Sequence, residues 1–178
     1  MYMKKIISLM LFAINFPVFA QVLIGKTSVT NSSVSLEFGS DNRGLVLPWV
    51  TNTTSVTGAV DGTMVYDISD HKVKIKYTSG WNDLSVDTTG TTVDSVTGID
   101  GMIIQNAAVE NTSAKVSVGI PTSVPGILVL EDSDKSMILP KTASPHLNII
   151  NPSPGMIVYD TTAKMLAVFN GNMWSFWQ

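Results

Sequence analysis

Two short stretches of this chain are nearly the same. Residues 62–67 are Gly-Thr-Met-Val-Tyr-Asp, and residues 155–160 are Gly-Met-Ile-Val-Tyr-Asp, at an offset of 93 positions. In each stretch a short apolar run lies between a glycine and an aspartate. A run of this length bounded by turn residues is typical of a β-strand. The pair therefore predicts the same strand twice.

Further matches occur in the same order at nearly the same offset. Residues 44–48 are Gly-Leu-Val-Leu-Pro, and residues 136–140 are Ser-Met-Ile-Leu-Pro. Trp81 and Trp174 follow the two Tyr-Asp stretches, again 93 positions apart, and upstream a glycine precedes a Leu-Glu pair by the same interval in both halves. Ordered matches of this kind indicate an internal duplication.

The duplication divides the chain into four parts. We expect a first β-repeat unit at 21–84, a linker at 85–115 and a second β-repeat unit at 116–178, after a leader at 1–20. A unit of about 60 residues buries only about 60% of the surface of its unfolded chain and is marginally stable alone. Because the chain has no cysteine for disulfides, we expect the two units to pack on each other or on other chains.

Alternating residues predict strands rather than helices. Val73, Ile75 and Tyr77 alternate with three lysines, which places the apolar side chains on one face of a strand and the charges on the other. Asn170-Gly171 suits a tight turn. After residue 20 no window has a convincing 3.6-residue period. The expected fold is all-β, built of two duplicated small units with short strands and hairpins.

The linker has two kinds of sequence. Residues 87–92 are Asp-Thr-Thr-Gly-Thr-Thr, a composition typical of flexible segments. Residues 101–105 are Gly-Met-Ile-Ile-Gln, which predicts an extra strand.

Residues 1–20 have the layout of a secretory signal peptide. Lys4 and Lys5 precede an apolar stretch at 6–16, and Ala20 lies before the expected cut. The alternative is a membrane anchor, but a bilayer span needs about 20 apolar residues and this run is shorter. We therefore expect an exported protein, at the cell surface or outside the cell, with the periplasm as a further location.

Composition excludes several classes of protein. The net charge is −3, and the chain has 14 acidic but only 11 basic residues with no basic stripe, which excludes an electrostatic nucleic-acid binder. The lack of cysteine excludes a disulfide scaffold and a thiolate zinc site.

The repeated motifs resemble a module of secreted Bacteroidetes proteins. The order of Ile-Gly, Leu-Glu, Gly-Leu-Val-Leu-Pro, Gly-x-Met-Val-Tyr-Asp and a final Trp is similar to a surface-protein and tail-fibre-like repeat of that group. The resemblance implies exposure at the cell surface and implies no catalytic residue. Where that family commonly has Pro-Arg, this chain has Pro48-Trp49 and Pro140-Lys141, so no role of that arginine is transferred.

Residues with catalytic potential do not form a recognisable set. Ser40-Asp41-Asn42 matches one serine β-lactamase element, but the Lys-Thr-Gly element of that set is missing from the sequence. His71 and His146, the only histidines, follow turn residues and have no second ligand at helical or hairpin spacing. We expect solvated loop histidines, no cofactor and no enzyme.

Two weaker motifs lie in or near the linker. The aspartates at 61, 67, 87, 94 and 100 supply oxygen ligands suited to calcium, but their spacing is equally that of turn residues. Asp94-Ser95-Val96 resembles the site at which Bacteroidetes attach O-glycans, which makes Ser95 a candidate for modification.

The duplication sorts the aromatic residues. Aromatics present in both units, which we expect to form the structural core of the repeat, are Tyr66, Trp81, Tyr159 and Trp174. Aromatics present in one unit only are candidates for binding or for an interface, and these are Trp49, Phe176 and Trp177. An exposed tryptophan suits stacking on a sugar or anchoring a protein. The other interpretation is that Trp49 and Trp177 cover the core or a seam between the units.

The sequence thus predicts a secreted or cell-surface structural or adhesive protein that presents a rigid binding or assembly surface. The alternative is a carbohydrate-binding module that uses Trp49 and Trp177. The C-terminal residues 173–177 are rich in apolar side chains, and this tail and the uncharged stretch 165–169 predict burial of the second unit against the first unit, a second copy or a partner protein.

Overall fold

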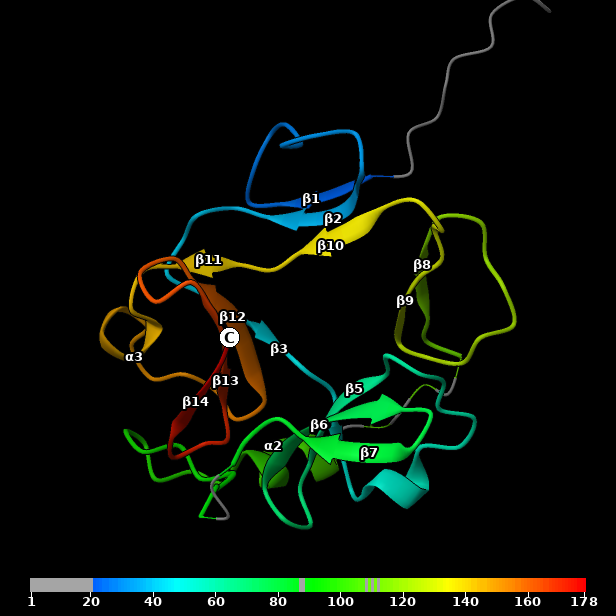
Figure 1. Ribbon diagram of the computed structural model, residues 1–178. Helices are drawn as coiled ribbons and strands as arrows, with labels where there is room; N and C mark the ends of the chain where they lie inside the picture. Colours follow the sequence, from blue (N-terminus) through cyan, green and yellow to red (C-terminus); the bar gives the residue numbers. More distant parts are fainter. Residues whose placement is uncertain (1–20, 87–88, 108, 110, 112) are drawn as a thin grey trace, which may run out of the picture.

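The computed structural model describes residues 21–86, 89–107, 109, 111 and 113–178, and in these residues the chain forms short strands in several small sheets with few helical turns (Figure 1). This confirms the all-β prediction. The expected signal peptide lies outside the described residues. Among the residues that are described, no helix has the length and apolar character needed to cross a membrane.

Each unit contributes four strands with the same topology to one sheet. In both sheets a two-residue strand pairs in parallel with a longer strand, which then continues into an antiparallel meander of two more strands. The first sheet is β4 (Trp49–Val50), β5 (Met64–Asp67), β6 (Lys72–Tyr77) and β7 (Gly80–Asp83), and the second is β11 (Lys141–Thr142), β12 (Met156–Asp160), β13 (Met165–Phe169) and β14 (Trp174–Trp177).

The remaining elements are duplicated as well. A parallel pair opens each unit, a linking strand follows it, and a helical turn precedes the long strand. In the first unit these are β1 (Val22–Ile24), β2 (Val34–Phe38), β3 (Leu45–Val46) and the 3₁₀ turn η1 (Thr53–Ser55). In the second they are β8 (Val116–Val118), β9 (Leu128–Leu130), β10 (Ser136–Ile138) and α3 (Pro145–Asn148).

The hairpin turns repeat in detail. The turns from β5 to β6 and from β12 to β13 each contain one non-glycine residue with a left-handed backbone, His71 at φ 55° and Lys164 at φ 59°. These residues lie 93 positions apart, the offset found in the sequence. The same turn geometry therefore sets the register of both hairpins.

The two units exchange their linking strands. The linking strand β3 of the first unit pairs in antiparallel with β12 of the second unit, and β10 of the second unit pairs in parallel with β2 of the first (Figure 1). Each unit therefore completes a sheet of the other. The prediction that the second unit lies against the first agrees with this arrangement.

A shared hydrophobic core lies between the sheet of β4 to β7 and the sheet of β11 to β14. Its buried side chains come from both units and are Leu47, Tyr66, Val73, Leu84, Ile157 and Val168. A second cluster on the other face of the second sheet contains Ile149, Met156, Val158, Ala167 and Phe169, with Trp174 packed against it. Both faces of β13 are covered as a result.

The linker differs from the expectation. Residues 101–105 belong to a short helix, α2 (Gly101–Ala107), rather than to an extra strand. Asp100 begins this turn because its carboxylate accepts the N–H of Met102 at 3.0 Å. Ile103 and Ile104 are exposed, so no neighbouring strand covers the run. A short apolar run does not distinguish a strand from a helix by periodicity alone.

Candidate assembly interface

The linking strands use different backbone positions for their two kinds of neighbour. Directly after β3, the N–H of Leu47 donates to the carbonyl of Gly155 at 3.0 Å, next to β12. In β10, the N–H of Ser136 donates to the carbonyl of Ser33 at 2.9 Å, next to β2. The two linking strands are offset by 92 positions, so Ser136 corresponds to Gly44 of the first unit. Gly44 lies three residues before Leu47, which is an odd number. Because successive residues of an extended strand point their N–H groups to opposite sides, the two bonds leave opposite edges of the linking strand.

Trp49 lies in the seam between the units. Its indole is half-buried, and the Nε1–H donates to the carbonyl of Pro154 in the second unit at 2.8 Å. The ring centroid lies 5.6 Å from that of Tyr66. The helix α2 covers another side of the Trp49 ring, because a Cβ at Gly101 would lie 2.7 Å from the indole.

Tyr66 is fully buried at the centre of the same seam. Its hydroxyl donates to the carbonyl of Asn170 in the second unit at 2.8 Å and lies 3.3 Å from the carbonyl of Thr91. Burial raises the pKa of Tyr66, so the phenol stays protonated and remains a donor. The first unit, the second unit and the linker therefore meet at one side chain.

Two glycines allow the close approach at this seam. Gly155 has φ +79°, and a Cβ there would lie 2.8 Å from the Cβ of Tyr66. A Cβ at Gly90 would lie 2.4 Å from the carbonyl oxygen of His71 and 2.6 Å from that of Asn170. The described part of the linker thus packs between the two units.

Trp177 and Phe176 lie at the C-terminal end of the seam. The Nε1–H of Trp177 donates to the carbonyl of Leu84 in the first unit. The side chain of Trp177 is 39% exposed and that of Phe176 is 38% exposed. Phe176 makes an edge contact with His146, with ring centroids 5.8 Å apart. Of the three one-copy aromatics, Trp49 and Trp177 each bond to the other unit.

The other repeated aromatics are less buried than Tyr66. Trp81, Tyr159 and Trp174 are half-buried. Trp174 packs on Phe169 with ring centroids 5.1 Å apart, and Trp81 lies opposite Lys76 on the neighbouring strand. The matched positions therefore do not have matched burial.

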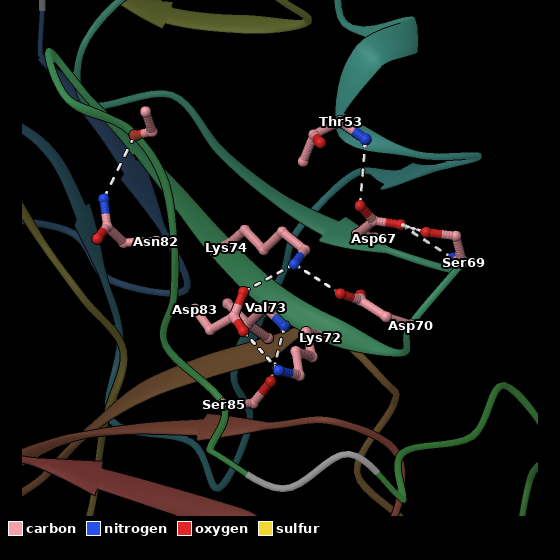
Figure 2. A network of polar contacts seen from close by, with 11 residues as sticks. Thr53, Asp67, Ser69, Asp70, Lys72, Val73, Lys74, Asn82, Asp83 and Ser85 are labelled. Carbon is pink, nitrogen blue, oxygen red and sulfur yellow. Dashed lines mark hydrogen bonds and ion pairs between the residues drawn. The ribbon is translucent and has the colours of Figure 1, made fainter.

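The aspartate of the Tyr-Asp motif anchors two loops in each unit. Asp67 is buried, and its carboxylate accepts the N–H groups of Thr53 at 3.1 Å and Ser69 at 2.9 Å (Figure 2). In the second unit Asp160 accepts the N–H groups of Ser144 at 3.0 Å and Thr162 at 2.8 Å. The carboxylate thus joins the helical turn before the strand to the hairpin after it.

Asp160 remains ionised despite its burial. Burial disfavours the charged carboxylate, but the hydrogen bonds from backbone N–H groups outweigh this effect and lower the pKa of Asp160. Sequence reasoning missed this role for both aspartates. The signal was present, since Tyr-Asp occurs at the same place in both units.

The glutamate of the Leu-Glu pair has a similar role. Glu37 is buried and accepts the N–H of Thr30 at 2.8 Å, while Glu131 accepts the N–H of Thr122 at 3.1 Å. Glu37 also forms an ion pair with Lys26 at 2.5 Å. The hydrogen bonds from Lys26 and Thr30 lower the pKa of Glu37 to about 2.

Charged side chains of the first sheet form a network on its outer face. Lys74 contacts Asp70 at 2.6 Å and Asp83 at 2.7 Å, and Lys72 contacts Asp83 at 2.5 Å (Figure 2). Two of the three lysines predicted from the alternation, Lys72 and Lys74, are thus paired with carboxylates, while Lys76 donates to the carbonyl of Tyr77.

The remaining candidates lie in turns. His71 is half-buried beside Tyr66, with Nδ1 at 3.5 Å from its hydroxyl, and His146 is an exposed residue of α3. Ser95 is exposed in a turn in which Asp94 accepts the N–H groups of Val96 and Thr97. Among the described residues no three His, Cys, Asp or Glu side chains lie close enough to hold a metal ion.

Part of the chain is similar to a known family. Residues 117–178, which are nearly the whole second unit, match the family model described as a phage tail like trimerisation region. No curated protein and no solved structure matches the chain. The match supports a tail-fibre-like family for the second unit and, with it, a structural role and self-association of the chain.

Proposed function

We propose that this protein is an exported structural component whose two β-repeat units hold chains together in a three-fold assembly and present a rigid surface outside the cell. The observation that carries the proposal is the strand exchange between the units. β3 and β10 each complete a sheet that is not their own. A module that completes its sheets with strands from a neighbouring module is suited to assembly.

The family match and the duplication together support three-fold association. The matched region corresponds to the second unit, and the first unit repeats its topology strand by strand. Both units are therefore candidates for the same kind of assembly. Closed rotational symmetry is the usual form of such homo-oligomers.

Export and surface exposure are part of the proposal. They are supported by the leader-like layout of residues 1–20 and by the resemblance to secreted Bacteroidetes repeats. The presented surface would consist of the loops and of the one-copy aromatics that remain partly exposed, Phe176 and Trp177.

No observation favours the carbohydrate-binding alternative over assembly. Trp49 and Trp177 both direct their indole N–H groups to backbone carbonyls of the opposite unit. A sugar-binding platform would need both rings free on one face, whereas the ring of Trp49 is covered by Tyr66 and α2.

Native mass spectrometry and light scattering of residues 21–178 test the assembly. We expect a trimer as the main species, and a monomer at all accessible concentrations would contradict the proposal. Fractionation of cells that produce the full chain tests export, with the N-terminus of the exported protein expected at Gln21. Recovery of the protein with residues 1–20 attached to membranes would contradict that part.

A further inference from the structure

The strands β7 and β14 lie at equivalent places in the two units and have different side chains on the outer face. Asp83 of β7 lies opposite Lys74 and forms an ion pair with it at 2.7 Å. At the offset of 93 positions, Phe176 of β14 takes the place of Asp83 and lies opposite the buried Ala167. Phe176 is 38% exposed. An aromatic side chain is therefore partly open where the first unit has a paired carboxylate.

The helical turn α3 lies beside β14 on the same outer face (Figure 1). The residue that follows the turn, Ile149, is buried in the second hydrophobic cluster together with Ala167 and Phe169. His146 of α3 makes the edge contact with Phe176, with ring centroids 5.8 Å apart. The turn and the strand therefore form one continuous side of the second unit.

Two aliphatic residues on this side of the second unit are open to solvent. Leu147 is 73% exposed and Ile150 is 91% exposed. At the offset of 93 they correspond to Thr54 and Thr57 of the first unit. We call Leu147, Ile150 and Phe176 the α3–β14 surface. Neighbouring large apolar side chains that stay exposed mark a site of contact with another molecule.

The α3–β14 surface adjoins the seam between the units. Trp177, the last residue of β14, donates its indole N–H to the carbonyl of Leu84 in the first unit. On the other side Asn151, the residue after Ile150, donates from Nδ2 to the carboxylate of Asp94 in the linker at 2.6 Å. Polar groups commonly form the rim of an interface that has an apolar centre. The surface is therefore bounded by the seam on one side and by a polar rim on the other.

The family match covers the residues of this surface. All three lie within residues 117–178, which match the phage tail like trimerisation region. Their counterparts in the first unit, Thr54, Thr57 and Asp83, are polar and lie outside the match. The part of the chain that is similar to a trimerising region is thus the part that has the open apolar surface. This favours a second copy of the chain as the molecule that covers it.

Three-fold symmetry adds a requirement on charge. A surface at a three-fold axis contacts the same surface of the other two copies, so that any charge there meets a like charge. The α3–β14 surface consists of two aliphatic side chains and one aromatic ring. The matching face of the first sheet has Lys72, Lys74 and Lys76, and three copies of it would bring nine lysines together. Of the two faces, only that of the second unit suits a position at the axis.

We propose that the α3–β14 surface is the contact between copies of this chain, and that three second units meet through it around the three-fold axis. Leu147 and Ile150, the most exposed members, lie nearest the axis. The contact also covers Phe176, so that Trp177 and the loops remain for the surface that the assembly presents. The inference rests on the proposed assembly function and names its contact.

A charge at Leu147 tests the contact. Leu147→Glu in residues 21–178 places one carboxylate of each copy near the axis, where like charges repel. Native mass spectrometry should show trimers for the parent chain and monomers for this variant. Because Leu147 is 73% exposed in the single chain, the fold should be retained, and circular dichroism checks this.

Ile120→Glu is the matched control. Ile120 is 84% exposed and also lies within the matched residues 117–178. It follows β8, which lies on the side of the molecule away from α3 (Figure 1). The same kind of substitution at this place should leave the trimer intact.

A mixture of two charge variants tests whether Leu147 meets its own copies. Leu147→Lys alone should be monomeric, as Leu147→Glu is. An equimolar mixture of the two should form trimers that contain both kinds of chain, because opposite charges then meet at the axis. Trimers of Leu147→Glu alone, an equal loss of trimer for Ile120→Glu, or a mixture without mixed trimers overturns the inference and leaves the proposed function intact. A monomeric parent chain overturns both.

Discussion

The strands β6 and β13 occupy the same position in the two units, but their outer faces differ. On β6 the outward residues are Lys72, Lys74 and Lys76, and the first two form ion pairs with Asp83 and Asp70. At the equivalent positions β13 has Met165, Ala167 and Phe169, of which the last two are buried in the second hydrophobic cluster. One unit has a charged surface where the other has a second core.

The inner faces of β6 and β13, in contrast, are both apolar and both buried. Val73 of β6 and Val168 of β13 are both fully buried and both belong to the core that the units share. The repeat therefore requires one apolar face, the one that packs on the next unit. The other face is free to vary because the topology does not depend on it.

The largest predicted effect tests the edge that only one unit has covered. Ile157 is 1% exposed beside β3, and its counterpart Met64 in β5 is half-buried, with no strand in the place that β3 has beside β12 among the described residues. Ile157→Ala should lower the free energy of unfolding by about 2–5 kcal/mol, and Met64→Ala should lower it by less. Urea unfolding of residues 21–178, at one protein concentration for all variants, measures both. Equal losses would show that the two edges are equally covered.

The next prediction compares two glycines of the same motif. Gly155 and Gly62 both have positive φ, but a Cβ at Gly155 meets Tyr66 while a Cβ at Gly62 meets nothing within 4 Å. Gly155→Ala should therefore cost about 1–3 kcal/mol more than Gly62→Ala through overpacking. The backbone strain is common to both variants and cancels. Thermal unfolding provides the comparison, and identical melting temperatures would contradict the close seam.

A pH titration compares the two Leu-Glu pairs. The pKa of Glu37 is about 2 in the folded chain, below the value of about 4.3 for an unperturbed glutamate. Its contribution to stability is therefore present above pH about 4.3 and is lost as the pH falls towards the folded value. Glu37→Gln should flatten the stability curve in this window.

Glu131→Gln is the matched control for this titration. Glu131 bonds to Thr122 and has no ion pair among the described residues. The comparison uses the difference in free energy of unfolding between each variant and the parent chain at each pH. If the two variants changed the curve equally, the pair with Lys26 would have no special role.

The smallest predicted effect concerns the charged face of β6. Lys74→Met removes two ion pairs whose acidic partners are substantially exposed, and such pairs contribute about 0–1 kcal/mol. We expect a change in the free energy of unfolding within that range, decreasing further at high salt. A loss comparable to that of Ile157→Ala would mean that the charged network is part of the core structure.

Much of the fold could be predicted from local patterns. Alternation at 72–77 and the bounded apolar runs at 64–66 and 156–159 predicted strands that the structure contains. The helix α2 could not be predicted in this way, because Met102-Ile103-Ile104 has no period long enough to distinguish it from a strand. The sequence indicated Asp67 and Asp160 only as members of a Tyr-Asp pair that recurs in both units, and it did not indicate that they anchor loops.

The partners of the strands could not be predicted from the duplication alone. The offset of 93 indicated two equal units but did not indicate which strands pair with each other. In the structure the two-residue β3 pairs with β12 and the three-residue β10 pairs with β2. Pairing of such short strands depends on backbone groups far apart in the chain, for which the local sequence has no marker.

The sequence by itself determined the strand class, the repeat, the turn positions and the division of aromatics into shared and single copies, because each of these depends on residues close together in the chain. Only the tertiary structure decided which edges are covered. Leu36 and Leu130 occupy the same place in the same motif, yet the first is buried and the second is not. Burial is a property of the neighbour as much as of the residue, and in this chain the neighbour of Leu36 comes from the other unit.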